Sequence, residues 1–366
     1  MKKILPASLF LTLVMNAWSQ PSPPLRVAID GMVHDHVNWI LGRKPLGDIE
    51  IVGIAEPNQQ LVDAYVKRYG FDKKLVYPSL EKLVEAVRPE AVLAFNSVYD
   101  HLKTVEFCAP RGIPVMVEKP LAANLEQAKT MLTLAKKHHI PLLTNYETTW
   151  YGSNEMTYDL VHTQNKIGEI RKLVFHTGHQ GPVEIGCKPE FLAWLTDPVL
   201  NGGGALMDFG CYGANLSTWL FKGKTPESVT AVALQIKPNI YPKVEDEATI
   251  ILKYDQAQVI IQASWNWPFG RKDMEVYGQT GYIFCQDNRH LSLREGEKKE
   301  TLPFTAAELP SSRKDPFIYF KNVIRGDIKL SPSDLSAPEN NETVMKILEA
   351  AKRSAKSGMT IRWSEL

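Results

Sequence analysis

The stretch Leu25-Arg-Val-Ala-Ile-Asp-Gly31-Met-Val-His34-Asp-His36 sets the fold of the first part of the chain. Its apolar start predicts a short buried strand, Gly31 predicts a tight turn, and a helical pattern follows. A strand, a glycine turn and a helix N-terminus together bind a pyrophosphate through backbone N–H groups and the helix dipole. Val33 and His36 replace the second and third glycines of the usual fingerprint. The stretch therefore predicts a dinucleotide site with an altered phosphate turn.

The chain around this stretch alternates short apolar segments with helical patterns as far as Asn145. The expected strands are Leu25–Ile29, Ile49–Ala55, Ala91–Phe95, Pro114–Val117 and Pro141–Thr144. The expected helices are Val33–Leu41, Gln59–Tyr69, Leu80–Val87, His101–Arg111 and Asn124–His138. This alternation predicts a doubly wound parallel sheet, which makes an α/β Rossmann domain over residues 20–145.

Ligands of such sheets bind beyond the carboxyl ends of the strands, where Gly31, Glu56, Asn96 and Lys119 fall. A carboxylate at the end of the second strand accepts hydrogen bonds from an adenosine ribose and repels a 2′-phosphate. Glu56 therefore predicts NAD rather than NADP. The alternative is that Glu56 is a solvated turn residue.

His34 and His36 are separated by one residue, so on a helix their side chains point in different directions. A metal site there would need an extended backbone. We expect local capping or packing beside the cofactor instead, and no metal.

Beyond Tyr146 the pattern changes to extended segments joined by turns, which predicts an α+β domain with a large open antiparallel sheet over residues 146–366. The expected strands are Ser228–Lys237, Glu247–Tyr254, Gln258–Trp265, Met274–Tyr277 and Tyr282–Cys285, with a further strand at Lys172–Phe175. The expected helices are Ser153–Thr163, Met207–Phe221 and Glu342–Ser357.

The segment Asn201-Gly-Gly-Gly-Ala-Leu-Met-Asp208-Phe-Gly-Cys-Tyr212-Gly-Ala-Asn215 carries the candidate chemistry of this second domain. Asp208 and Tyr212 lie four residues apart on one helical face, and Asn215 continues the same stripe. Lys119 follows a strand and could share their cavity. Lysine, tyrosine and aspartate around one cavity suit a nicotinamide-dependent alcohol oxidation. The alternative is that these are ordinary residues of a helix face.

Glu118-Lys119-Pro120, the glycine-rich segment ending at Tyr212 and the order of the elements resemble the Gfo/Idh/MocA oxidoreductases. The resemblance implies a Rossmann domain, an open-sheet domain, and a sugar or polyol above the nicotinamide. It also implies that Lys119 is the active-site lysine, and that the open sheet buries against a partner subunit as a homo-oligomer. The residues expected around the cofactor are Gly31, Met32, Val33, His34, Glu56, Asn96, Ser97, His101, Glu118, Lys119 and Asn145. Those expected to contact the substrate are Lys119, His179, Trp194, Asp208 and Tyr212.

As a hypothesis, Tyr212 removes the proton of a substrate hydroxyl while hydride passes to the nicotinamide. Many members of the family have histidine at this position. The pKa of Tyr212 must fall by roughly 2 units for it to act near neutral pH, and an ammonium about 4 Å away can supply that energy. We therefore expect Lys119 to lower the pKa of Tyr212, and Asp208 to keep Lys119 charged. Trp265 and Trp267 are candidates for sugar contacts, for the core or for a subunit interface.

The N-terminus has the features of a secretory signal over residues 1–19, with Lys2 and Lys3 before an apolar run and Ala17-Trp18-Ser19 after it. A buried first helix is the alternative. With 42 basic and 41 acidic residues, nothing indicates a nucleic-acid or membrane partner. The four cysteines form no CxxC pair, and we expect free thiols.

These observations predict a periplasmic, NAD-dependent oxidoreductase that acts on a sugar, glycoside or polyol and holds its cofactor tightly. Oxidation to 3-keto sugars is one candidate outcome. Two alternatives stay open: a redox glycosidase that oxidises and then eliminates an aglycone, and a non-catalytic sugar-binding protein.

Overall fold

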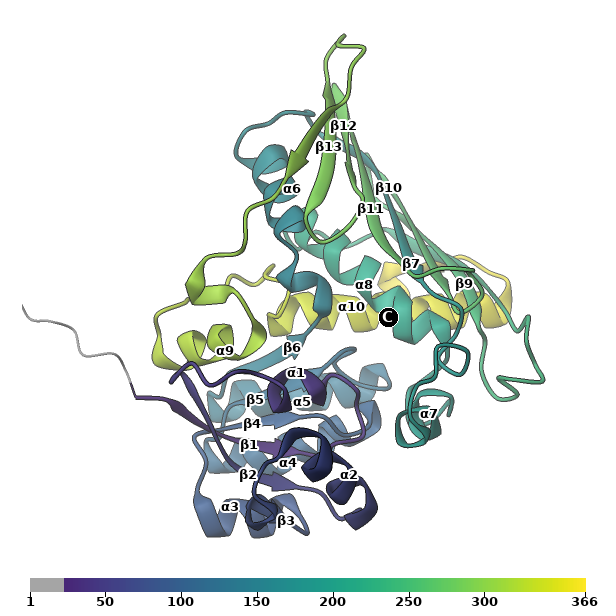
Figure 1. The fold of residues 1–366 in the computed structure, drawn as a ribbon. Coiled ribbons are helices and arrows are strands. Elements are labelled where there is room, and N and C mark those ends of the chain that lie inside the picture. The colour runs from purple at the N-terminus through teal and green to yellow at the C-terminus, as the bar shows by residue number, and fades with distance from the viewer. Residues whose placement is uncertain (1–22) are drawn as a thin grey trace, which may run out of the picture.

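The computed structural model describes residues 23–366, so the predicted signal peptide lies outside the described residues. Two sheets form separate layers, and the helices α8 (Ala205–Leu220) and α10 (Pro338–Ser357) lie between them (Figure 1). The edge of the first sheet therefore faces α8 and α10, and α8 carries Asp208 and Tyr212.

The first sheet has six parallel strands in the order β3-β2-β1-β4-β5-β6. The strands are β1 (Leu25–Asp30), β2 (Ile49–Ala55), β3 (Val76–Tyr77), β4 (Ala91–Ala94), β5 (Val115–Glu118) and β6 (Leu142–Asn145). Every residue of β4, β5 and β6 is buried, as expected for parallel strands covered by helices on both faces. The predicted doubly wound sheet is confirmed, and β3 is an addition to it.

The helices of this layer are α1 (Val37–Leu41), α2 (Gln59–Tyr69), α3 (Leu80–Val87), α4 (His101–Cys108) and α5 (Leu125–His138). The bounds of α2 and α3 agree with the predicted ones. The start predicted for α1 at Val33 is wrong, because the preceding residues form a turn tied to β4. In that turn the His34 amide donates to the Phe95 carbonyl at 2.9 Å.

The second sheet has nine strands in the order β14-β13-β12-β11-β7-β10-β9-β8-β15. The strands are β7 (Ile170–Gly178), β8 (Ser228–Leu234), β9 (Glu247–Lys253), β10 (Gln258–Ser264), β11 (Arg271–Gly278), β12 (Gly281–Cys285), β13 (His290–Glu295), β14 (Leu302–Thr305) and β15 (Ile361–Arg362). All pairings are antiparallel except β7 with β10. The expectation of a purely antiparallel sheet is corrected at this pair. A long crossover through α8 lets the two strands run the same way.

The remaining helices connect the layers. They are α6 (Gly152–His162), α7 (Pro189–Leu195) and α9 (Pro316–Arg325). The α9 side chains Phe317 and Phe320 return to the core of the first sheet. Every residue of α8 is buried, so this helix has no solvent-facing side. All four cysteines are free thiols. Within residues 23–366, no helix combines the length and the apolar character needed to cross a membrane.

Gly202 lies shortly before α8 and packs closely against Ala123, so replacing it should destabilise the protein. Its φ is +82°, and a Cβ there would lie deep inside van der Waals contact with the Ala123 carbonyl oxygen. Gly202→Ala should lower the free energy of unfolding by about 2–5 kcal/mol, from left-handed strain plus overpacking. Urea denaturation measures the change.

Gly223 is the matched control, since its φ is also +82° but an added Cβ meets nothing nearer than Ser333 Cβ at 4.0 Å. Gly223→Ala should lose only about 1–2 kcal/mol. Equal losses for the two variants would contradict the close approach of Gly202 to Ala123.

Candidate active site

A buried ion pair joins the two layers. Lys119 directly follows β5, and Asp208 lies in the first turn of α8. The Lys119 ammonium forms an ion pair with the Asp208 carboxylate and donates to the Asp208 carbonyl at 3.1 Å. Trp265 Nε1 donates to the other carboxylate oxygen at 3.0 Å. The structure therefore brings the predicted lysine and aspartate together, and it adds a tryptophan N–H to them.

Both members of this pair are ionised. Burial alone would raise the pKa of Asp208, but Lys119, His179 and the Trp265 hydrogen bond outweigh it and lower that pKa. Burial likewise opposes the charge of Lys119, but Asp208 outweighs it and raises the pKa of the ammonium. The site therefore contains a desolvated but neutralised charge pair.

Tyr212 lies beside this pair, but its predicted state is wrong. Lys119 Nζ lies 5.1 Å from the centroid of the Tyr212 ring, and Lys272 Nζ lies 5.0 Å from it. Burial raises the pKa of Tyr212 well above its ordinary value, and carboxylates including Glu147 and Asp208 add to the shift. Lys119 does not lower this pKa because its charge is matched by Asp208. Tyr212 is therefore a neutral phenol at physiological pH.

A second ion pair that the sequence analysis missed borders Tyr212. Lys272 of β11 pairs with Glu147, which lies in the turn after β6. Glu147 also accepts a hydrogen bond from the Tyr151 hydroxyl at 2.6 Å. The available signal was position, since Glu147 lies just beyond the carboxyl end of a parallel strand. Its partner, Lys272, could not be found from local sequence because it lies on the distant strand β11.

The predicted cofactor turn is present at the end of β1. Gly31 has φ +78°, and a Cβ there would lie 2.8 Å from Asn96 Cα. The buried Glu56 carboxylate accepts from the Met32 amide and the Asn58 amide, both at 2.9 Å. The alternative that Glu56 is a solvated turn residue is wrong. Burial raises the pKa of this carboxyl.

The groups around this turn fit a dinucleotide. Of the turn amides, those of Val33 and Asp35 have no acceptor among residues 23–366, which leaves them for phosphate oxygens. Asn96 Oδ1 and His101 Nε2 are buried and likewise lack a partner within the described part of the chain. Buried polar atoms without partners are expected where a polar ligand completes the site.

The other predicted cofactor residues lie along the same sheet edge. Ser97 Oγ donates to Asp100 Oδ2 at 2.6 Å, so it shapes the loop before α4. His101 Nδ1 lies 3.1 Å from the Leu121 carbonyl oxygen. Asn145 Nδ2 donates to Glu118 Oε1 at 2.7 Å.

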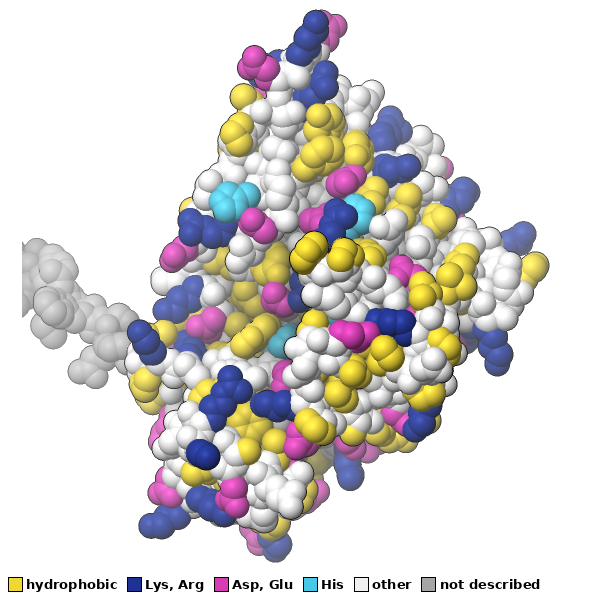
Figure 2. Space-filling view, turned by 45° about the vertical axis from the view of Figure 1, so that its right-hand side comes forward, with side chains coloured by type: hydrophobic (Ala, Val, Ile, Leu, Met, Phe, Trp, Pro, Cys, Tyr) yellow, Lys and Arg dark blue, Asp and Glu magenta, His cyan; other side chains and the backbone are white. Residues whose placement is uncertain are grey.

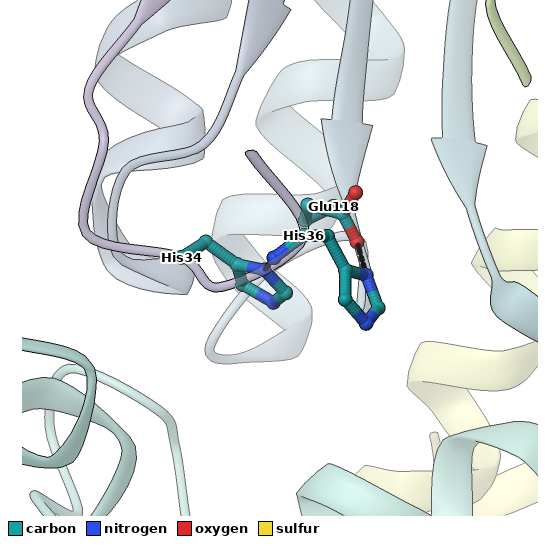
Figure 3. A group of neighbouring side chains, drawn as sticks. All are labelled: His34, His36 and Glu118. Atoms are coloured by element: carbon teal, nitrogen blue, oxygen red, sulfur yellow. Dashed lines mark hydrogen bonds and ion pairs between the residues drawn. The ribbon is translucent and has the colours of Figure 1, made fainter. Parts of the chain in front are cut away.

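His34 and His36 converge instead of diverging, because they lie in a turn that precedes α1 (Figure 3). His34 Nδ1 accepts from the His36 amide at 3.1 Å, which is the expected local capping. His36 Nδ1 also lies 2.8 Å from Glu118 Oε2. The expectation that the two imidazoles point apart is therefore wrong.

His179 and Trp194, the expected substrate contacts of the second domain, lie against different parts of the site. His179 packs edge-on against Phe209 of α8, with ring centroids 4.9 Å apart. Trp194 of α7 stacks on His34 at 5.5 Å and donates weakly to the Val33 carbonyl at 3.4 Å, so it covers the cofactor turn. Asn215 lies apart from this site.

Asn215 Nδ2 donates to the Leu335 carbonyl at 2.8 Å, within the packing of α8 against α10. Trp265 is fully buried, so of its alternatives the core is correct, and its N–H faces Asp208.

Comparison with known proteins shows the family of this chain. Residues 25–146 match the oxidoreductase family with an NAD-binding Rossmann fold, and residues 160–284 match the GFO/IDH/MocA C-terminal domain. The chain belongs to the Gfo/Idh/MocA oxidoreductases. NAD is the cofactor of this Rossmann domain, and Glu56 lies at the strand end where NAD specificity is set.

Individual relatives of this Gfo/Idh/MocA protein are distant. The trans-1,2-dihydrobenzene-1,2-diol dehydrogenase of Xenopus tropicalis is 24% identical over 317 residues, which cover 85% of this chain and 91% of that protein. The aldose-aldose oxidoreductase of Caulobacter crescentus superposes with a TM-score of 0.76 at 20% identity, covering 93% and 99% of the two chains. An inositol dehydrogenase homolog from Azotobacter vinelandii gives 0.77 at 18% identity, covering 93% and 98%.

His101 generates a prediction for acid stability. Burial lowers its pKa to about 4, below the ordinary value near 6.5. The unfolded chain therefore binds the proton first as pH falls, and the free energy of unfolding decreases between about pH 6.5 and 4. The slope from this one group approaches 1.4 kcal/mol per pH unit, at roughly its maximum. His34, whose pKa burial also lowers, adds in the same direction.

Urea denaturation across this pH range measures the slope. His101→Gln should lower this slope by up to about 1.4 kcal/mol per pH unit, the contribution of one proton. Equal slopes for the wild type and His101→Gln between about pH 6.5 and 4 would contradict a neutral buried His101.

Proposed function

We propose that this protein oxidises a CH–OH group of a sugar, glycoside or polyol with NAD. The observation that carries the proposal is the buried Lys119–Asp208 pair with Tyr212 beside it, at the carboxyl edge of an NAD-binding sheet. The names of the relatives support the substrate class, since they are a dihydrodiol dehydrogenase, an aldose-aldose oxidoreductase and an inositol dehydrogenase homolog.

The residues of the chain supply binding and proton transfer. Bound NAD supplies the hydride acceptor. Lys119 passes one proton to Asp208 Oδ1 and takes the proton of the substrate hydroxyl at Nζ, so its charge is restored next to the developing carbonyl. Tyr212 stays neutral and donates a hydrogen bond to the substrate. Trp265 holds Asp208 in place through its N–H.

We assign the rest of the substrate to a cavity beside Glu147, the partner of the Lys272 that borders Tyr212. The cavity has a volume of about 340 Å³ and includes the aromatic side chains of Trp39 and Trp150 with the charged groups of Arg43 and Glu147. Aromatic faces beside charged groups suit a sugar, which has apolar faces and a polar rim. The space-filling view shows the surface hollowed between the two layers, with charged side chains at the edge (Figure 2).

A periplasmic location is part of this proposal, and it requires a retained cofactor because free NAD is scarce outside the cytoplasm. Helix α7 supports retention. Trp194 covers the phosphate turn, and Lys188, which precedes the helix, donates to the Tyr65 hydroxyl of α2 at 2.6 Å. These two contacts hold α7 against the first layer.

One experiment tests activity, cofactor and location together. The full chain is expressed with its N-terminal segment and purified from periplasm without added nucleotide. Mass spectrometry should find NAD(H) bound and a chain beginning near residue 20. Incubation with an aryl glucoside, myo-inositol or a dihydrodiol and excess added NAD⁺ as the oxidant should convert at least one of them to a ketone and form an equal amount of NADH. Released aglycone would indicate oxidation followed by elimination.

Lys119→Met is the decisive variant, and it should lower turnover by about 10²–10⁴ while NAD(H) stays bound. Because it leaves Asp208 buried and unpaired, it should also destabilise the protein. The double variant Lys119→Met/Asp208→Asn should recover stability but not turnover. Full turnover in either variant, or a wild-type protein that neither binds NAD(H) nor forms a ketone, contradicts the proposal.

We also propose that the open face of the second sheet forms a subunit interface. Val232 and Leu234 of β8 lie two residues apart, and Ile251 of β9 lies between two buried residues; all three side chains are exposed. Exposed apolar side chains from neighbouring strands are typical of an interface.

Light scattering should show an oligomer that Val232→Lys converts to monomer. Val199→Lys is the matched control, because Val199 lies outside the sheet and both valines are 61% exposed. A monomeric wild-type chain would rule out this interface.

A further inference from the structure

Three metal-ligating side chains meet beside the Lys119–Asp208 pair. His34 and His36 come from the turn between β1 and α1, and Glu118 comes from the end of β5 (Figure 3). One ligand atom of each lies within 4.8 Å of the other two. His34 and Glu118 are buried, and the side chain of His36 is 18% exposed, which leaves one route from solvent.

The set of donors is chemically selective. Two imidazoles and one carboxylate suit zinc and its neighbouring first-row divalent ions, whereas magnesium and calcium prefer oxygen ligands. Three protein ligands also leave a position open, as in catalytic rather than structural sites. The ligand atoms lie within 4.8 Å of one another, and tetrahedral bonds of about 2.0–2.1 Å would hold them about 3.3 Å apart, so binding requires a further approach of the side chains.

Hydrogen bonds from neighbouring side chains orient the Glu118 carboxylate, as the groups around metal ligands commonly do. Asn145 donates to Glu118 Oε1 at 2.7 Å and so directs Oε2 toward His36. Trp150 Nε1 in turn donates to Asn145 Oδ1 at 2.9 Å. Such chains of hydrogen bonds fix carboxylate ligands.

Two groups in the cluster lack what a cation supplies. His34 Nε2 is buried without a partner among residues 23–366. Among residues 23–366, the side-chain hydrogen-bond partners of the buried Glu118 carboxylate are His36 and Asn145. The charge of the adjacent Lys119 is already matched by Asp208.

We propose that His34, His36 and Glu118 bind one divalent first-row transition ion of the zinc class, with an open position for an oxygen ligand. Glu118 immediately precedes Lys119 in the chain, so the proposed metal ligands adjoin the residue that forms the ion pair with Asp208. The amides of Val33 and Asp35 remain available for phosphate, so the ion and the dinucleotide do not compete for them. This inference goes beyond the proposed oxidoreductase activity and is measured without turnover.

Metal analysis of the full chain tests the proposal. The protein is stripped with a chelator, loaded with Zn²⁺, freed of excess ion and assayed by plasma mass spectrometry. The wild type should retain about one Zn²⁺ per chain, and Mg²⁺ should not replace it. Glu118→Gln, which still accepts from Asn145, should reduce retention at least about tenfold, and so should His36→Ala.

His176→Ala is the matched control. His176 Nδ1 lies 2.8 Å from Asp273 Oδ1, an equivalent imidazole–carboxylate pair outside the one such cluster found in residues 23–366. This variant should retain as much Zn²⁺ as the wild type. Circular dichroism confirms that each variant is folded.

Two outcomes overturn the inference: a wild type that retains no Zn²⁺ after loading, or equal loss in His176→Ala and Glu118→Gln. NAD(H) is measured in the same samples. A protein that binds NAD(H) but no Zn²⁺ contradicts the metal site and leaves the oxidoreductase proposal intact. A protein that binds Zn²⁺ but no NAD(H) supports the metal site and contradicts the oxidoreductase proposal.

Discussion

The buried ion pair between Lys119 and Asp208 is the constraint on which the rest of the site depends. Removing two charges from water is unfavourable unless they meet in good geometry with further hydrogen bonds. Here the Asp208 carbonyl and the Trp265 N–H provide those bonds. Because either charge alone would remain buried and unpaired, the pair couples the end of β5 to the first turn of α8. The edge of the nucleotide sheet and the second domain are thereby fixed relative to one another.

The same pair determines the chemistry of its neighbour. A lysine whose charge is matched exerts little net field on a nearby phenol, so burial controls the pKa of Tyr212. The base of the proposed oxidation is then the ion pair itself, whose net charge rises from zero to +1 as Asp208 becomes neutral, while the hydride neutralises the nicotinamide. The Glu147–Lys272 pair is a second ion pair next to the neutral Tyr212, and its two charges also neutralise one another.

The phosphate turn shows how a departure from a glycine fingerprint is accommodated. Val33 and His36 occupy the positions of the second and third glycines, and the ring of His34 packs against Trp194 while that of His36 lies beside Glu118. The turn keeps the free amides of Val33 and Asp35 but gains two imidazoles next to a buried carboxylate. The nucleotide edge of this protein therefore has a donor set that a plain glycine turn lacks.

The sequence by itself determined the doubly wound layer, the glycine turn with Glu56, and the lysine and aspartate of the site. Strand and helix periodicity are local properties, and the carboxyl ends of parallel strands share one edge. Helix α9, the parallel pairing of β7 with β10, and the partners Glu147 and Lys272 required the tertiary structure. So did the neutral state of Tyr212 and the convergence of His34, His36 and Glu118. Ionisation depends on burial and on charges contributed by distant segments, and neither quantity is encoded in local sequence.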